Sequence, residues 1–187
     1  MDAAKILRCA RDVLDIEAKG ILSLSNRLDE NFVRAVDILS GCKGKVVVTG
    51  LGKSGLIGRK IAATFSSTGT PSLFLHATEG IHGDLGMIMK EDVVLAVSNS
   101  GETDELLMLL PIIKRLGPKI IVMTGNPDSR LSRTGDVILN AAIKEEACPM
   151  GLSPTASTTA ALAMGDALAV VLLEKKGFKQ EDFALRH

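Results

Sequence analysis

The sequence has few cysteines, no excess of either charge and no long apolar run. Its 187 residues contain three cysteines, Cys9, Cys42 and Cys148, and no CxxC pair. We therefore expect reduced structural thiols rather than a disulfide framework or a zinc site. Basic and acidic residues each number 22, and this neutral balance disfavours a general nucleic-acid or membrane-surface role, because neither polyanion is attracted over distance. The partner is expected to be small.

The sequence also lacks an obvious targeting or membrane-spanning segment. The N-terminus begins MDAAK, without the apolar stretch of a signal peptide. The most apolar stretch, residues 160–173, is interrupted by Asp166 and is predicted to be too short to span a bilayer. We therefore expect a cytoplasmic protein with no membrane partner.

Short aliphatic runs alternate with segments of helical periodicity. The runs are VVV at 46–48, SLFL at 72–75, VVLAV at 93–97, KIIVM at 119–123 and DVIL at 136–139. None alternates apolar with polar residues, which is typical of strands buried on both faces of a parallel sheet. Residues 54–67 and 102–116 have the periodicity of helices. The pattern predicts a doubly wound α/β sandwich.

Further helices are predicted on either side of this core. Residues 3–40 form one or two amphipathic helices, with a break near Gly20 or near Asn31. Residues 155–176 form an alanine-rich helix whose small side chains permit close packing. No linker or repeat divides the chain, so we expect one domain over residues 1–187, with the helical segment 1–40 packed on it.

The turn GLGKSG, residues 50–55, follows the first predicted strand and partly matches two nucleotide-binding motifs. A Walker A loop needs a glycine five residues before Gly52, but that position is Val47, inside the strand. A dinucleotide site needs an acidic residue at the end of the second strand, and the nearest acid there is Glu79, well into the next loop. Neither motif is complete. A turn that only lets the helix pack close to the sheet remains an alternative.

A second turn, SNSGET at residues 98–103, lies between the strand at 93–97 and a helix expected to start near Glu102. Ser98, Ser100 and Thr103 place three hydroxyls around a helix N-terminus, where free amides and the helix dipole favour an anion. Capping alone would need only Ser100. Three hydroxyls and a glycine instead predict a phosphomonoester pocket. Both turns are expected to meet at the carboxyl edge of the sheet.

These two turns, together with HGDLGM at 82–87 and the block EACPMGLSPTASTTAALAMGDALA at 146–169, closely resemble the sugar isomerase (SIS) domain family. Within it the resemblance is to D-arabinose 5-phosphate isomerases, which make the precursor of the Kdo sugar of lipopolysaccharide. It implies a flavodoxin-like three-layer sandwich with a five-stranded parallel sheet, a homotetramer and active sites shared between subunits. The family's usual chain continues past LRH with a glycine-rich segment and a pair of CBS domains, which we do not expect in this single SIS domain.

The resemblance also implies the site residues of an aldose–ketose isomerase acting on a pentose phosphate, without a cofactor or metal. The catalytic set is Lys53, His82, Glu105, Glu146 and His187. The phosphate would be held by Ser54, Ser98, Ser100 and Thr103, and further substrate contacts would come from Gly52, Asn99 and Gly101. We expect at most adventitious, inhibitory binding of zinc at His82.

The implied residue types suit an enediol mechanism, which needs a base, a proton carrier and charge stabilisation. Glu105 and Glu146 are interpreted as the acid and base, with Glu146 as the proton abstractor, while His82 and His187 assist ring opening or the proton shuttle. Lys53 would stabilise the enediolate. The uncharged stretch after Glu146 predicts a partly desolvated carboxylate with a raised pKa. Taken alone, each of these residues is also explained by a solvated surface, a turn or a frayed terminus.

Three other functions are weighed against this one. A non-catalytic phosphosugar sensor usually carries a helix-turn-helix module, and residues 1–40 are too short and insufficiently basic for one. Another phosphosugar isomerase or a sugar-phosphate etherase of the same family would share the SNSGET-like turn, but is not expected to share HGDLGM and the EACP block together. A dinucleotide oxidoreductase would need the missing ribose acid.

Overall fold

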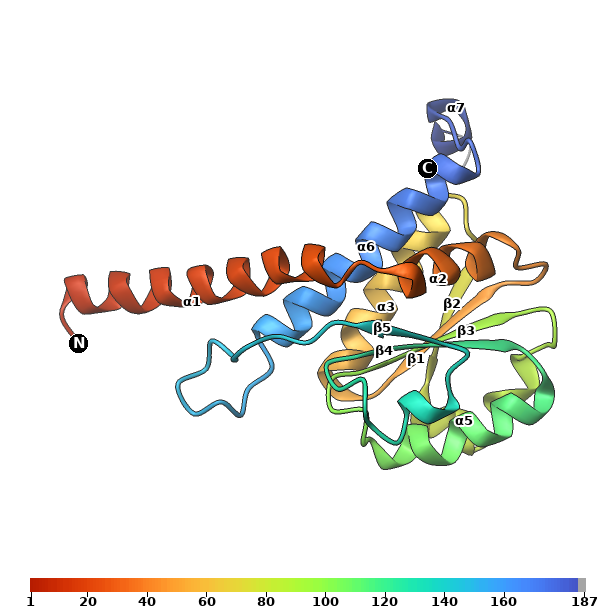
Figure 1. Ribbon diagram of the computed structural model, residues 1–187, viewed down its shortest axis with the longest axis horizontal. Helices are drawn as coiled ribbons and strands as arrows, with labels where there is room; N and C mark the ends of the chain where they lie inside the picture. The colour runs from red at the N-terminus through yellow and green to blue at the C-terminus, as the bar shows by residue number, and fades with distance from the viewer. Residues whose placement is uncertain (185–187) are drawn as a thin grey trace.

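The computed structural model describes residues 1–184, which form a five-stranded parallel sheet between layers of helices (Figure 1). The strand order is β2-β1-β3-β4-β5, the flavodoxin-like order that was predicted. The strands are β1 (Val46–Gly50), β2 (Ser72–His76), β3 (Val93–Ser98), β4 (Lys119–Thr124) and β5 (Val137–Asn140). Each aliphatic run of the sequence is one of these strands. The weakest run, SLFL, is the edge strand β2, which is only partly buried.

Helices cover both faces of the sheet (Figure 1). On one face lie α2 (Glu30–Ser40), α3 (Gly52–Ser67) and α6 (Ala156–Lys175), whose side chains form one core with the sheet. On the other face lie α5 (Asp104–Leu116) and the short α4 (Ala77–Ile81). Three short elements join or follow these helices: the 3-10 turns η2 (Asp84–Met87) and η3 (Ser132–Thr134) and the helix α7 (Gln180–Ala184). Burial of both sheet faces explains why the strands show no polar alternation.

The N-terminal segment is two helices, α1 (Ala3–Leu24) and α2, joined by the 3-10 turn η1 (Ser25–Arg27). The break lies close to the predicted one near Asn31. Gly20 instead lies inside α1, buried where a Cβ atom would come within 3.4 Å of the Ile143 side chain. The first part of α1 projects beyond the sheet (Figure 1). Its apolar side chains there are exposed, including Ile6, Leu7 and Leu14.

Helix α6 is apolar around its whole circumference, as is expected of a helix buried in a protein core. Contrary to the sequence prediction, this helix is long and apolar enough to cross a membrane by length and composition alone. In the fold, however, α6 packs against α1, α2 and α3. Met164, Leu168 and Leu172 are buried there, and Asp166 forms an ion pair of 2.6 Å with Lys60 of α3. Core packing therefore accounts for the apolar residues on its buried side, while Val170 and Val171 remain exposed.

Candidate active site

The turns GLGKSG and SNSGET meet at the point between β1 and β3 where the strand order of the sheet reverses. Gly50, at the end of β1, pairs with Val97 of β3 in parallel register. From β1 the chain moves outward to β2, and from β3 it moves the opposite way to β4, so a crevice opens between the two strand ends. A Cβ atom on Gly50 would lie 3.2 Å from the Cα of Gly55. The glycines therefore let α3 begin directly against the strand end, and the predicted meeting of the turns is confirmed.

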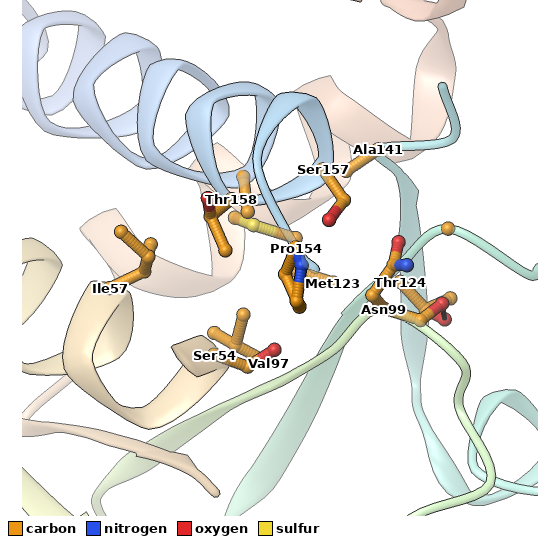
Figure 2. Close-up of a pocket in the computed structure, with 12 residues that line it drawn as sticks. Ser54, Ile57, Val97, Asn99, Met123, Thr124, Ala141, Pro154, Ser157 and Thr158 are labelled. Carbon is orange, nitrogen blue, oxygen red and sulfur yellow. Dashed lines mark hydrogen bonds between the residues drawn. The ribbon is translucent and has the colours of Figure 1, made fainter. Parts of the chain in front are cut away.

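A cleft lies between these turns and the first turn of α6 (Figure 2). Two of the predicted site residues, Ser54 and Asn99, line it. The others that line it with polar groups are Thr124, Ser157 and Thr158, and sequence reasoning missed all three. The rule that placed the first two turns at the carboxyl edge of the sheet also applies to Thr124, which ends β4, and to Gly125 after it. The sequence therefore did contain a signal for Thr124.

The SNSGET turn is braced by its own side chains. The buried Ser98 hydroxyl is 2.9 Å from the Thr103 hydroxyl and accepts a hydrogen bond of 3.1 Å from the Gly101 amide. Gly101 has φ 65°, and a Cβ atom on it would collide with the Ser129 hydroxyl oxygen, so this position requires glycine. Ser98 and Thr103 thus hold the turn in shape, and their direct contact with a phosphate stays a prediction.

The helix after this turn starts later than predicted. α5 begins at Asp104 with Thr103 as its N-cap, not near Glu102. The Ser100 hydroxyl accepts a hydrogen bond of 3.1 Å from the Glu102 amide, two residues along, so it closes a small turn. Ser100 is therefore not the N-cap. Its exposed position leaves the hydroxyl accessible at the carboxyl edge of the sheet.

The turn after β4 packs closely against Asn99. The Asn99 carbonyl accepts hydrogen bonds from the Gly125 amide at 3.0 Å and the Thr124 hydroxyl at 3.3 Å. A Cβ atom on Gly125 would collide with the Asn99 side-chain oxygen. The glycine therefore makes room for the asparagine, whose amide group points into the cleft (Figure 2).

Glu146 lies at the N-terminus of α6, and its carboxylate is held by that helix end. Its Oε2 atom accepts hydrogen bonds from the Thr155 amide at 2.8 Å, the Thr155 hydroxyl at 3.0 Å and the Ser157 amide at 3.2 Å. Burial raises the pKa of Glu146, but the hydrogen bonds from Ser157 and Thr155 outweigh it and leave the pKa below its ordinary value. The prediction of a raised pKa is wrong: the folded loop brings donors back onto the carboxylate.

Lys53 lies beside the cleft, in a second hollow at the first turn of α3. The hollow is also lined by Gly52, Arg59, Phe74 and His76. The Arg59 guanidinium lies over the Phe74 ring, 4.8 Å from its centroid. Gly52 has φ 55°. The edge of the site towards β2 is therefore rich in positively charged and aromatic groups, which suits an anionic ligand.

None of the predicted catalytic side chains within residues 1–184 lines the cleft itself. Lys53 lies in the hollow beside it, and Glu146 contacts the cleft wall through the Ser157 amide. Glu105 lies half-buried in the first turn of α5, and His82 is exposed between α4 and η2. Neither lines the cleft or the hollow beside it. His187 lies outside the described residues. Within residues 1–184, no group of three or more His, Cys, Asp or Glu side chains is placed to hold a metal ion. Adventitious zinc at His82 stays a prediction.

Comparison with known proteins identifies close relatives. Residues 38–171 match the SIS domain. Two proteins named arabinose 5-phosphate isomerase KdsD, from Shigella flexneri and Pseudomonas aeruginosa, are each 54% identical to this chain. The matches cover 96% and 97% of this chain but 55% and 56% of those proteins, so the chain spans about half their length. The structure of E. coli CFT073 c3406 in complex with arabinose 5-phosphate is 43% identical, with a TM-score of 0.97 over the whole of both chains.

Proposed function

This chain belongs to the SIS domain family, and we propose that it is an aldose–ketose isomerase that interconverts D-arabinose 5-phosphate and D-ribulose 5-phosphate. The observation that carries the proposal is the cleft itself. It joins two strand-end turns rich in hydroxyl and amide donors to a helix end that holds a carboxylate, Glu146. The identity to proteins named arabinose 5-phosphate isomerase, and to a structure in complex with arabinose 5-phosphate, supports this choice of substrate.

The substrate phosphate would bind at the edge formed by the two turns. Ser54 lies in the first turn of α3, where the amides have no partner within the helix and the dipole favours an anion. Ser100 and Asn99 face the same edge from the turn after β3. Lys53, in the neighbouring hollow, adds a positive charge. The glycines of both turns allow the backbone to approach the phosphate closely.

The sugar chain would then extend towards α6 and Glu146. In the aldose, a base removes the proton on C2, and the electron pair forms the enediol, which is protonated at C1 to give the ketose. Glu146 would remove that proton as the carboxylate held at the α6 end of the cleft. Its lowered pKa keeps it ionised at neutral pH but makes it a weaker base than an ordinary glutamate. Glu105 and the histidines His82 and His187 would move protons between the two oxygens, and Lys53 would stabilise the enediolate.

We also propose that the protein is a homotetramer whose subunits complete each other's sites. Glu105 and His82 do not line the cleft of their own chain. The projecting part of α1 exposes Leu7 and Leu14, and the loop before α6 exposes Met150 and Leu152. Apolar side chains gathered on projecting segments favour association. A neighbouring subunit seated on them would bring further residues near the cleft.

The proposed reaction is the first step in making the Kdo sugar of lipopolysaccharide, and we expect it to take place in the cytoplasm. The direct test is incubation of the purified protein with arabinose 5-phosphate or ribulose 5-phosphate, followed by identification of the product. Formation of each from the other supports the proposal. Binding without turnover would point to a sensor, and turnover of a different phosphosugar alone would point to another isomerase of the family.

A further inference from the structure

Ser157 lies in the wall of the cleft, and within residues 1–184 its buried hydroxyl has no hydrogen-bond partner of normal geometry. Ser157 as a whole residue is only 3% exposed. Its Oγ atom is fully buried and makes no hydrogen bond of normal geometry with any residue that the structure describes, although it lies beside the Glu146 carboxylate. Buried hydroxyls are nearly always paired, since an unpaired one loses its hydrogen bonds to water without replacement.

The other hydroxyls of this helix end are satisfied. The Thr155 hydroxyl donates to Glu146. The Thr158 hydroxyl donates to the Thr155 carbonyl at 2.8 Å, and the Thr159 hydroxyl contacts the same carbonyl and the Glu17 carboxylate. Ser157 therefore differs from its neighbours. Figure 2 shows its oxygen pointing into the space between α6 and the turns after β3 and β4.

We propose that the Ser157 hydroxyl binds a hydroxyl or carbonyl oxygen of the sugar chain and so positions the reacting carbons next to Glu146. This inference rests on the proposed function. A serine hydroxyl can donate one hydrogen bond and accept others, which matches a sugar oxygen. A sugar oxygen held there would lie beside the carboxylate that is to remove the proton.

The negative charge of Glu146 disfavours the substrate phosphate as the ligand of Ser157. The Ser157 amide already donates to the Glu146 carboxylate at 3.2 Å, so the positive end of the α6 dipole is occupied by a negative charge. A phosphate bound at Ser157 would bring further negative charge beside that carboxylate. The anion is better placed at the α3 end of the cleft, and the uncharged part of the substrate at Ser157.

The test is Ser157→Ala, compared with Thr49→Val as a matched control. Thr49 carries the other buried hydroxyl without a partner among residues 1–184, but it does not line the cleft. Both variants remove an unpaired hydroxyl, so both should unfold at the wild-type temperature or above it. Only Ser157→Ala should lower kcat/KM for arabinose 5-phosphate, by roughly 5- to 100-fold for one lost hydrogen bond.

Two further readouts separate the sugar from the phosphate. Ser157→Ala should weaken the binding of arabinose 5-phosphate while leaving the binding of inorganic phosphate unchanged, and Ser157→Thr should recover part of the activity by restoring the hydroxyl. If the wild type isomerises the sugar and Ser157→Ala does so equally well, the role of Ser157 is refuted and the proposed function stands. If the wild type neither binds nor isomerises the pentose phosphate, the proposed function fails, and the assignment of Ser157 fails with it.

Discussion

Thr155 donates two hydrogen bonds to one oxygen of Glu146, from its backbone amide at 2.8 Å and from its hydroxyl at 3.0 Å. The same hydroxyl accepts a hydrogen bond of 2.9 Å from the Ala147 amide, next to the glutamate. Thr155 thus closes the loop that follows Glu146 and fixes the carboxylate against the start of α6. This contact holds the carboxylate proposed as the base in position and, together with Ser157, lowers its pKa against the effect of burial.

Replacing Thr155 by valine should raise the pKa of Glu146. The substitution removes one hydrogen bond that stabilises the ionised carboxylate. Burial, which favours the protonated form, then has the larger effect on the pKa. The acidic limb of the kcat/KM profile should therefore move to higher pH. Thr155→Ser keeps the hydroxyl and should retain the wild-type profile. An unshifted acidic limb in Thr155→Val would separate Glu146 from the ionisation that controls activity.

Glu146→Gln should abolish most of the activity while preserving the fold. The amide oxygen of glutamine can still accept the hydrogen bonds from Thr155 and Ser157, but it cannot remove a proton. Loss of a general base typically costs about 10²- to 10⁴-fold in rate. Glu145→Gln, at the exposed neighbouring position, is the control and should be close to wild type. Steady-state kinetics and thermal unfolding of both variants measure this. Near-normal turnover by Glu146→Gln would exclude it as the base.

Asp92→Asn should destabilise the domain far from the cleft. Asp92 is 3% exposed and accepts hydrogen bonds from the Lys45 side chain at 2.8 Å, the Lys45 amide at 2.9 Å and the Met89 amide at 2.8 Å. We expect a loss of about 1.5–3 kcal/mol in the free energy of unfolding at neutral pH, typical of a hydrogen-bonded charge. Asp37→Asn, which breaks an exposed ion pair with Lys175, should cost at most about 1 kcal/mol.

The effect of Asp92 should depend on pH in a defined direction. Burial raises the pKa of Asp92, but hydrogen bonds from Lys45 and Met89 outweigh it, so the pKa in the folded state lies below its ordinary value of 3.8. The stabilisation is therefore complete above the unfolded pKa and is lost as the pH falls through the folded pKa. Urea unfolding at several pH values should show the wild type and Asp92→Asn converging in acid. A constant difference that persists well below the ordinary pKa of an aspartate would contradict this.

Introducing charge on the projecting part of α1 should dissociate the oligomer. Leu7 and Leu14 lie two helical turns apart, so they share one face, and both are exposed in the single chain. Leu7→Lys with Leu14→Lys should shift the mass measured by light scattering from a tetramer towards smaller species and lower the activity. Leu116→Lys, at an exposed position at the end of α5, is the control. An unchanged mass in the double variant would remove α1 from the interface.

The sheet and the position of the cleft could be predicted because they depend on patterns local to the sequence. Buried parallel strands need uninterrupted aliphatic runs, and VVV and VVLAV are such runs. The end of each strand then places its turn at one edge of the sheet. Helix starts were less accurate: α5 begins at Asp104 because the Ser98 and Thr103 hydroxyls extend the turn before it.

The environment of individual site residues could not be predicted in the same way. The sequence shows that little charge follows Glu146, but not that the Thr155 and Ser157 amides turn back to face it. Ser157 looked like one hydroxyl among several in PTASTT, and only the fold shows which of them lacks a partner. Glu105 and His82 belong to segments on the α5 side of the sheet, and neither lines the cleft of this chain.

Proton exchange during turnover is the most direct test of whether this cleft isomerises the sugar phosphate. The purified protein is incubated with D-arabinose 5-phosphate in D₂O and the mixture is followed by NMR. We predict formation of D-ribulose 5-phosphate with deuterium entering at C1, and deuterium entering C2 of the arabinose 5-phosphate formed in the reverse direction. Glu146→Gln should show neither at a comparable rate. A folded wild-type protein that produces no ketose and exchanges no deuterium would contradict the assignment of this cleft as an isomerase site.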